Sequence, residues 1–396
     1  MDIAALQRTL REERLDGWLL YDFRGQNPIA RDALGLAGHM LTRRWFYLVP
    51  AQGAPKLLCH AIELGNFPDE VEGERVTYSS WQSLREKLER LVSALPPDPR
   101  VAMEYCALAA IPTLSRVDAG TVELIRQLGV QVISSADLVQ RFLCRWGPHQ
   151  LASHVRALRA IDDAKDAAFE QIALAQRDGR EITETTVQRF LVQELARARL
   201  QTDHPPIVAI NGHAADPHYE PSDARPTPVR PGDLVLIDLW AKGEKPADAY
   251  ADITWVGFCG DRPPPGAEEI FRIVAEARDE GLAALRTAWS NEQVLEGWEV
   301  DRVVRGRIAE SGYGERFLHR TGHSLGTSDV HGDGANLDDL ETHDTRPLVQ
   351  GLAFSIEPGI YLPQEGLGVR TEIDVVMTGD GPQVFSKVQQ ELVRIR

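Results

Sequence analysis

The chain has 396 residues, enough for two or three domains that each bury a core. Its 43 Lys and Arg residues against 59 Asp and Glu give a formal charge of −16, which argues against nucleic acids and anionic membranes as partners. The opening segment, MDIAALQRTLREERLDG, carries charges where a signal peptide has an apolar core, and no stretch is apolar enough to span a bilayer. Together with four scattered cysteines that form no CxxC pair, this predicts a cytoplasmic protein with reduced thiols.

The first 146 residues have the pattern of an α/β domain. Strands are predicted at DGWLLYDF, WFYLVPA, APKLLCHAI, RVAMEY and VQVISSA, and an amphipathic helix at SSWQSLREKLERLVSAL. The pattern changes at RWGPH, where a long helical stretch rich in Ala and in charged pairs begins. We therefore place an N-terminal domain at 1–146 and a second domain at 147–396.

The second domain alternates helices with strands. A second helix, TETTVQRFLVQELARARL, opens with a Thr cap and leads into the strand PPIVAING. Two apolar runs in DLVLIDLWAKGEKPADAYADITWVGF flank a turn and predict a hairpin. Another helical stretch runs from PPPGAEE to about residue 310, so the fold class is α/β (α+β).

Four carboxylates lie in these apolar strands. Asp238 and Asp252 occupy the two arms of the hairpin, Glu357 lies in LAFSIEPGIY before Pro and Gly end the strand, and Glu372 lies in GVRTEIDVVMT. A carboxylate in such a setting is costly unless a cation or hydrogen-bond donors meet it. The alternative to a metal is that each acid pairs with an arginine at a sheet edge.

The last of these segments is predicted to be one strand. Alternation along it places Arg370, Glu372 and Asp374 on one face.

Three histidines lie between the two pairs of acids. His319, His323 and His331 stand among glycines in FLHRTGHSLGTSDVHG, an arrangement that salt bridging alone does not explain. One imidazole with four carboxylates suits Mn²⁺, Co²⁺ or Zn²⁺ better than a metal that prefers thiolates. So many acids favour two ions over one.

The motifs HRTGHSLG, DVHG, SIEPGIY and GVRTEID, preceded by LIDL and YADITW, resemble those of prolidases and Xaa-Pro aminopeptidases. These metallopeptidases share the pita-bread fold with methionine aminopeptidases and creatinase. The resemblance covers about residues 207 to 376 and implies a pita-bread catalytic domain after an N-terminal domain like that of creatinase and prolidase. It also implies the ligands of two divalent ions, with Mn²⁺ favoured: Asp238 on one ion, Asp252 and Glu372 bridging both, and His323 and Glu357 on the other.

The resemblance further implies hydrolysis of an Xaa-Pro bond by a metal-bridging hydroxide. Glu357 would act as general base and then acid, and His218 and His331 would stabilise the developing oxyanion or hydrogen-bond the substrate. His319 would support the substrate. For His218, in the turn-rich segment DPHY, the alternative is a turn-capping or surface histidine, which is also our interpretation of His213.

A dipeptidase differs from an aminopeptidase in having a group that captures the proline carboxylate. Arg346 and Arg370 are the candidates, although for Arg370 we favour neutralisation of the acid cluster. Arg43 and Arg44 are interpreted as a solvated pair at a strand end, the alternative being that they reach the site from the other domain or from a partner subunit.

We therefore expect a homodimeric prolidase that cleaves Xaa-Pro dipeptides. The alternatives are an Xaa-Pro aminopeptidase acting on longer peptides and a non-catalytic pita-bread binding protein, which retention of five ligands disfavours. The sequence departs from the family at Trp240 and Trp255, where many relatives have Gly and Arg. These two changes bear on substrate range more than on reaction type.

Overall fold

The computed structural model describes all 396 residues and divides into two compact units, unit 1 at Met1–Leu143 and unit 2 at Cys144–Arg396. None of its helices combines the length and the apolar character needed to cross a membrane.

Unit 1 is built on a six-stranded mixed sheet in the order β4-β3-β2-β1-β5-β6. The strands are β1 (Gly17–Asp22), β2 (Trp45–Pro50), β3 (Lys56–His60), β4 (Glu74–Tyr78), β5 (Arg100–Met103) and β6 (Gln131–Ser134). The helices are α1 (Ile3–Glu12), α2 (Pro28–Ala33), α3 (Trp81–Val92), α4 (Ala119–Gln127) and α5 (Ala136–Val139). The five predicted strands and the predicted helix are confirmed. Ser80 is the N-cap residue of α3, and its side chain accepts a hydrogen bond from Ser83 N in a capping box.

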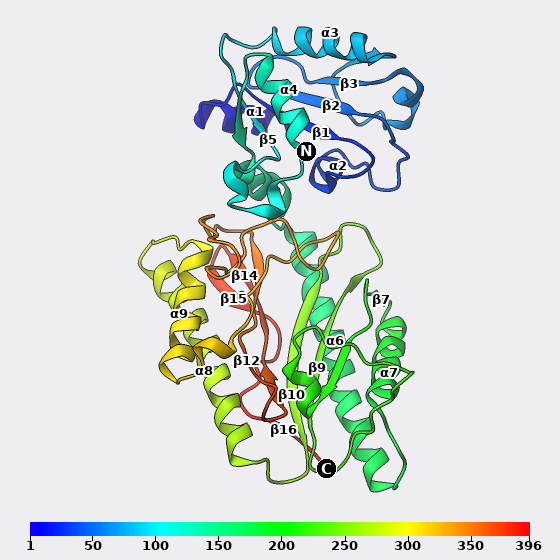
Figure 1. Cartoon of the computed structure of the whole chain (residues 1–396), viewed down its shortest axis with the longest axis vertical. Coiled ribbons are helices and arrows are strands. Elements are labelled where there is room, and N and C mark those ends of the chain that lie inside the picture. The colour runs from blue at the N-terminus through cyan, green and yellow to red at the C-terminus, as the bar shows by residue number, and fades with distance from the viewer. The chain divides into compact units, whose positions relative to one another are not determined.

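Unit 2 places two helix pairs on opposite sides of its strands (Figure 1). Helices α6 (Pro148–Arg177) and α7 (Glu184–Arg197) pack on the hairpin of β9 (Leu234–Gly243) and β10 (Ala251–Cys259). Helices α8 (Pro265–Ser290) and α9 (Gly297–Glu310) pack on the C-terminal strands. The other strands are β7 (Leu200–Gln201), β8 (Ile207–Ile210), β11 (Ala353–Ile356), β12 (Gly359–Leu362), β13 (Leu367–Arg370), β14 (Ile373–Thr378), β15 (Gly381–Val384) and β16 (Val393–Ile395).

The hairpin and the capped helix are as the sequence predicts. β9 and β10 pair antiparallel, with Asp252 opposite Trp240 and Thr254 opposite Asp238. Thr183 caps α7 by accepting a hydrogen bond from Thr186 N. The third predicted helical stretch is two helices, because residues 291–296 separate α8 from α9.

The acid-bearing C-terminal strands are shorter than predicted. Gly359 begins a new strand, β12, and the predicted strand through Glu372 is broken into β13 and β14. The break follows from a change of partner: β13 pairs with β12, whereas β14 pairs with β11 and β15. Glu372 therefore lies between the end of β13 and the start of β14, where its main-chain N–H donates to Thr254 O of β10.

Candidate metal centre

Unit 2 contains a cavity of about 660 Å³ lined by residues from both halves of its fold. Its walls include eight residues that the sequence singles out: Asp238, Asp252, His323, Glu357, Glu372, His218, His319 and His331.

Three of the expected ligands form a tight buried cluster. Asp252, His323 and Glu372 each offer a ligand atom, and these atoms lie within 4.8 Å of one another. His323 Nε2 also lies 3.4 Å from Glu357 Oε1. The other ring nitrogen, Nδ1, is 3.0 Å from the carbonyl of Ser324, which can only accept, so Nδ1 carries the proton and Nε2 turns its lone pair to the acids.

Two carboxylates of the cluster are buried without enough hydrogen-bond donors or positive charge around them, and a bound cation would supply that charge. Asp252 Oδ1 and Glu372 Oε1 are buried without a hydrogen-bond partner. Burial, together with repulsion from the neighbouring carboxylates, raises the pKa of both residues well above the ordinary range. Carboxylate oxygens and one imidazole lone pair that lie within 4.8 Å of one another fit a divalent metal ion.

Asp238 already has a cationic partner. Its carboxylate pairs with Arg370, which also donates to Tyr361 Oη at 3.0 Å and to Thr254 Oγ1 at 3.3 Å. Burial still raises the pKa of Asp238, although Arg370 opposes the shift. Asp238 is therefore the one acid for which the alternative of pairing with an arginine holds. Its side chain nevertheless lines the cavity.

Glu357 is held as an anion. Burial raises its pKa, but attraction to the protonated forms of His323 and His319 and to the fixed charge of Arg370 outweighs burial, and the net pKa is lowered. Ser355 Oγ donates to Glu357 Oε1 at 3.1 Å. A charged carboxylate beside the cluster is suited to accept a proton.

His319 is neutral and tied down at both nitrogens. Nδ1 bonds to the Arg320 carbonyl at 2.8 Å and Nε2 to Tyr361 Oη at 2.7 Å, and burial lowers its pKa to about 4. Because the carbonyl can only accept, Nδ1 carries the proton and donates to it, and Nε2 accepts a hydrogen bond from the Tyr361 hydroxyl. These two hydrogen bonds fix the orientation of the His319 ring in the wall of the cavity.

His218 and His331 lie exposed at the rim of the cavity. The His331 ring packs edge-on to His323 at a centroid distance of 4.2 Å. His213 does not line the cavity, and its Nδ1 lies 2.9 Å from Glu184 Oε1.

The two candidate carboxylate-binding arginines are both engaged elsewhere. Arg346 is buried, donates twice to Asp344 at 2.9 and 2.7 Å and once to Asp333 O, and does not line the cavity. Arg370 is occupied by Asp238. The arginine that lines the cavity without a hydrogen bond or ion pair of its guanidinium is Arg320. Its position in HRTGHSLG, three residues before His323, was the available signal in the sequence.

The two tryptophans lie on opposite faces of the hairpin. Trp240 lines the cavity, and its indole N–H donates to Asp203 at 2.7 Å. Trp255 lies outside it and packs on the core, with Lys165 Nζ 3.4 Å from its ring centroid.

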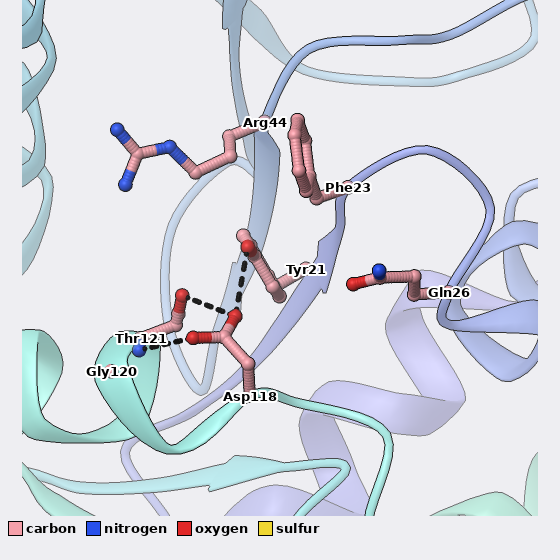
Figure 2. A pocket seen from close by; sticks show the side chains of 7 residues that line it. All are labelled: Tyr21, Phe23, Gln26, Arg44, Asp118, Gly120 and Thr121. Atoms are coloured by element: carbon pink, nitrogen blue, oxygen red, sulfur yellow. Dashed lines mark hydrogen bonds between the residues drawn. The ribbon is translucent and has the colours of Figure 1, made fainter.

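Unit 1 has a hollow of its own, of about 680 Å³, where Arg44 and Gln26 point toward open space (Figure 2). Its one carboxylate, Asp118, is already bonded to Tyr21 Oη and to Thr121. Arg43 lies 3.7 Å from Glu63 and is half exposed. No cluster able to hold a metal lies in this hollow.

Comparison with known proteins gives the family of the chain. Residues 155–379 match the model of metallopeptidase family M24. An Xaa-Pro dipeptidase of Pyrococcus horikoshii is 31% identical over 238 residues, 60% of this chain and 61% of that protein. The chain thus aligns with somewhat less than two thirds of that relative's length.

Solved structures share the fold over nearly the whole chain. A dipeptidase from Mycobacterium ulcerans superposes with a TM-score of 0.76 at 23% identity, covering 99% of this chain and 96% of that one. An X-prolyl aminopeptidase from Caenorhabditis elegans, described as a cytosolic enzyme with a di-nuclear active site, has a TM-score of 0.68 at 16% identity and covers 98% of this chain and 61% of that one. The predicted pita-bread fold is confirmed, and the chain belongs to metallopeptidase family M24.

Proposed function

We propose that this protein is a binuclear metal-dependent prolidase that hydrolyses the Xaa-Pro bond of dipeptides. The observation that carries the proposal is the buried cluster of Asp252, His323 and Glu372, whose free oxygens and imidazole lone pair converge. The name of the Pyrococcus relative supports the Xaa-Pro bond as the target, and the di-nuclear site of the Caenorhabditis enzyme supports two ions.

We assign the ligands as Asp238, Asp252, His323, Glu357 and Glu372, with Mn²⁺ favoured and Co²⁺ or Zn²⁺ possible by donor type. Bound ions would supply hydroxide at neutral pH and polarise the substrate carbonyl.

The remaining residues of the site bind substrate and move protons. Glu357, held as an anion, takes a proton at its carboxylate and returns it to the leaving nitrogen. His218 and His331 at the rim donate hydrogen bonds where negative charge develops on the substrate. His319, whose ring is fixed by hydrogen bonds at both nitrogens, supports the substrate from the wall of the cavity.

Arg320 replaces Arg346 and Arg370 in our proposal as the group that captures the proline carboxylate. Of the two arginines that line the cavity, Arg370 is neutralised by Asp238, whereas Arg320 has a free guanidinium. Burial, together with the nearby charge of Arg320, lowers the pKa of His323, which supports an orientation toward the site. The acids Asp203, Asp216, Asp329 and Glu341 also line the cavity and would favour the protonated amino end of a dipeptide.

The wider assignments follow the same relatives. We propose that unit 1 corresponds to the creatinase/prolidase-like domain placed at 1–146 and unit 2 to the catalytic domain placed at 147–396. We also propose a homodimer and a cytoplasmic location, and four free cysteines and the cytosolic relative support the location.

The test is release of free leucine from Leu-Pro, from Leu-Pro amide and from the tripeptide Leu-Pro-Ala by metal-stripped protein, with and without Mn²⁺. We expect Mn²⁺-dependent cleavage of Leu-Pro and weak cleavage of the other two. Arg320→Met should raise KM for Leu-Pro by about 10- to 100-fold, the value of a charged hydrogen bond, and leave Leu-Pro amide unchanged.

Equal cleavage of the tripeptide would make the protein an Xaa-Pro aminopeptidase. No cleavage of any of the three with Mn²⁺ present would refute the Xaa-Pro proposal and favour a binding protein.

A further inference from the structure

The main chain at Asp252 is held by side chains outside the proposed ligand set. Asp252 N–H donates to Asp374 Oδ2 at 2.8 Å, and Asp374 is fully buried on β14. Asp252 lies near the start of β10, and its carboxylate would have to keep one fixed direction to hold a metal ion. A hydrogen bond to the main chain at that residue limits how the carboxylate can swing.

A second contact fixes the chain two residues earlier. His154, fully buried on α6, lies with Nδ1 2.7 Å from the carbonyl of Tyr250. Since the carbonyl can only accept, His154 Nδ1 is the donor. Its other nitrogen, Nε2, lies 3.9 Å from Asp374 Oδ2. The imidazole thus binds the carbonyl of residue 250 and lies near the carboxyl group that holds residue 252, without a hydrogen bond to that carboxyl group.

The imidazole itself is fixed by packing. The ring of Trp146 lies against it, with the two centroids 4.9 Å apart. Both His154 and Asp374 occupy the apolar interior, where polar side chains are costly unless they have partners. Neither side chain lines the cavity, so neither can touch a substrate there.

We propose that Asp374 and His154 are positioning residues that orient Asp252 for metal binding, a role that rests on the metal centre of the proposed function. Outer partners of metal ligands fix ligand direction, and their loss typically costs about 10- to 100-fold in metal affinity. Thr254, which donates to Glu372 Oε2 at 2.8 Å, gives the other bridging acid a comparable support.

The test is calorimetric titration of Mn²⁺ into the stripped full-length protein, with the melting temperature measured on the same samples. Asp374→Ala and His154→Ala should each weaken Mn²⁺ binding by about 10- to 100-fold. Asp374→Asn keeps an oxygen that accepts from Asp252 N, and His154→Asn keeps a donor near the place of Nδ1. Both conservative variants should restore most of the affinity.

Val375→Ala is the matched control, because Val375 is fully buried next to Asp374 but points into the opposite, apolar core. It should lower the melting temperature and leave Mn²⁺ affinity unchanged. Because loss of Asp374 can unfold unit 2, His154→Ala separately tests the support of the same segment, through its hydrogen bond to Tyr250 O.

Unchanged affinity in His154→Ala, or an equal loss in Val375→Ala, would overturn the positioning role while the metal centre stood. A wild-type protein that bound no Mn²⁺ would overturn both proposals.

Discussion

Replacing Arg370 by Met tests whether this arginine stabilises the acid cluster. The change removes the cation beside Asp238 and leaves a carboxylate that is 8% exposed without its partner. Breaking a buried ion pair from one side costs about 3–5 kcal/mol. For a unit of the size of residues 144–396, each kcal/mol corresponds to about 2–4 °C, so the melting temperature of metal-free protein should fall by about 6–20 °C.

Two further samples, followed by scanning calorimetry, separate charge from packing. The double variant Asp238→Asn with Arg370→Met removes both charges and should recover more than half of the loss, because a neutral pair of similar volume is tolerated. Saturating Mn²⁺ should also shrink the loss in the single variant, since a bound cation would neutralise Asp238 again. A double variant as unstable as the sum of its two single changes would refute this account of Arg370.

Three other outcomes are expected. Burial raises the pKa of Glu104 in unit 1 to about 7. The free energy of unfolding of unit 1 should therefore fall by up to about 3 kcal/mol as the pH rises from 4.5 to 7. Glu104→Gln should flatten this pH dependence in urea unfolding. A larger pH dependence in the variant would contradict the assignment. Trp240→Gly should raise kcat/KM for Phe-Pro relative to Ala-Pro by about tenfold or more, because Trp240 narrows the cavity; an unchanged ratio in steady-state assays would place the Xaa side chain elsewhere. Mn²⁺ at about 100 times its Kd should raise the unit 2 melting temperature by about 5–10 °C, and identical melting with Mn²⁺ and with a chelator would argue against the site.

The positions of the acids on the hairpin were predictable, because two apolar strands with one carboxylate each leave few ways to satisfy the charges. Asp238 and Asp252 indeed line the same cavity. The break before Ile373 was not predictable, since it arises because β13 pairs with β12 whereas β14 pairs with β11 and β15. A continuous alternating pattern looks the same whether or not its pairing changes midway.

The choice among the arginines was also beyond the sequence. Arg346 and Arg320 both flank motif residues, and only the fold shows that Asp344 engages the first while the second faces the cavity. Asp374 was placed on the acid face, but its bond to Asp252 N depends on the distant approach of β14 to β10. For Asp374 the missing information is a contact between segments 122 residues apart, whereas the Arg346–Asp344 pair is local and depends on how the loop that carries both residues folds.

The most direct test of the central claim is to count Mn²⁺ ions bound per chain in stripped and reloaded protein, and to follow Leu-Pro cleavage across the same titration. We predict two ions per chain, with proline release rising as they bind. Glu372→Gln and His323→Ala should lose both the tight binding and the cleavage. Proline release at full rate from chelated protein, or loading of the His323→Ala variant equal to that of wild type, would contradict the account.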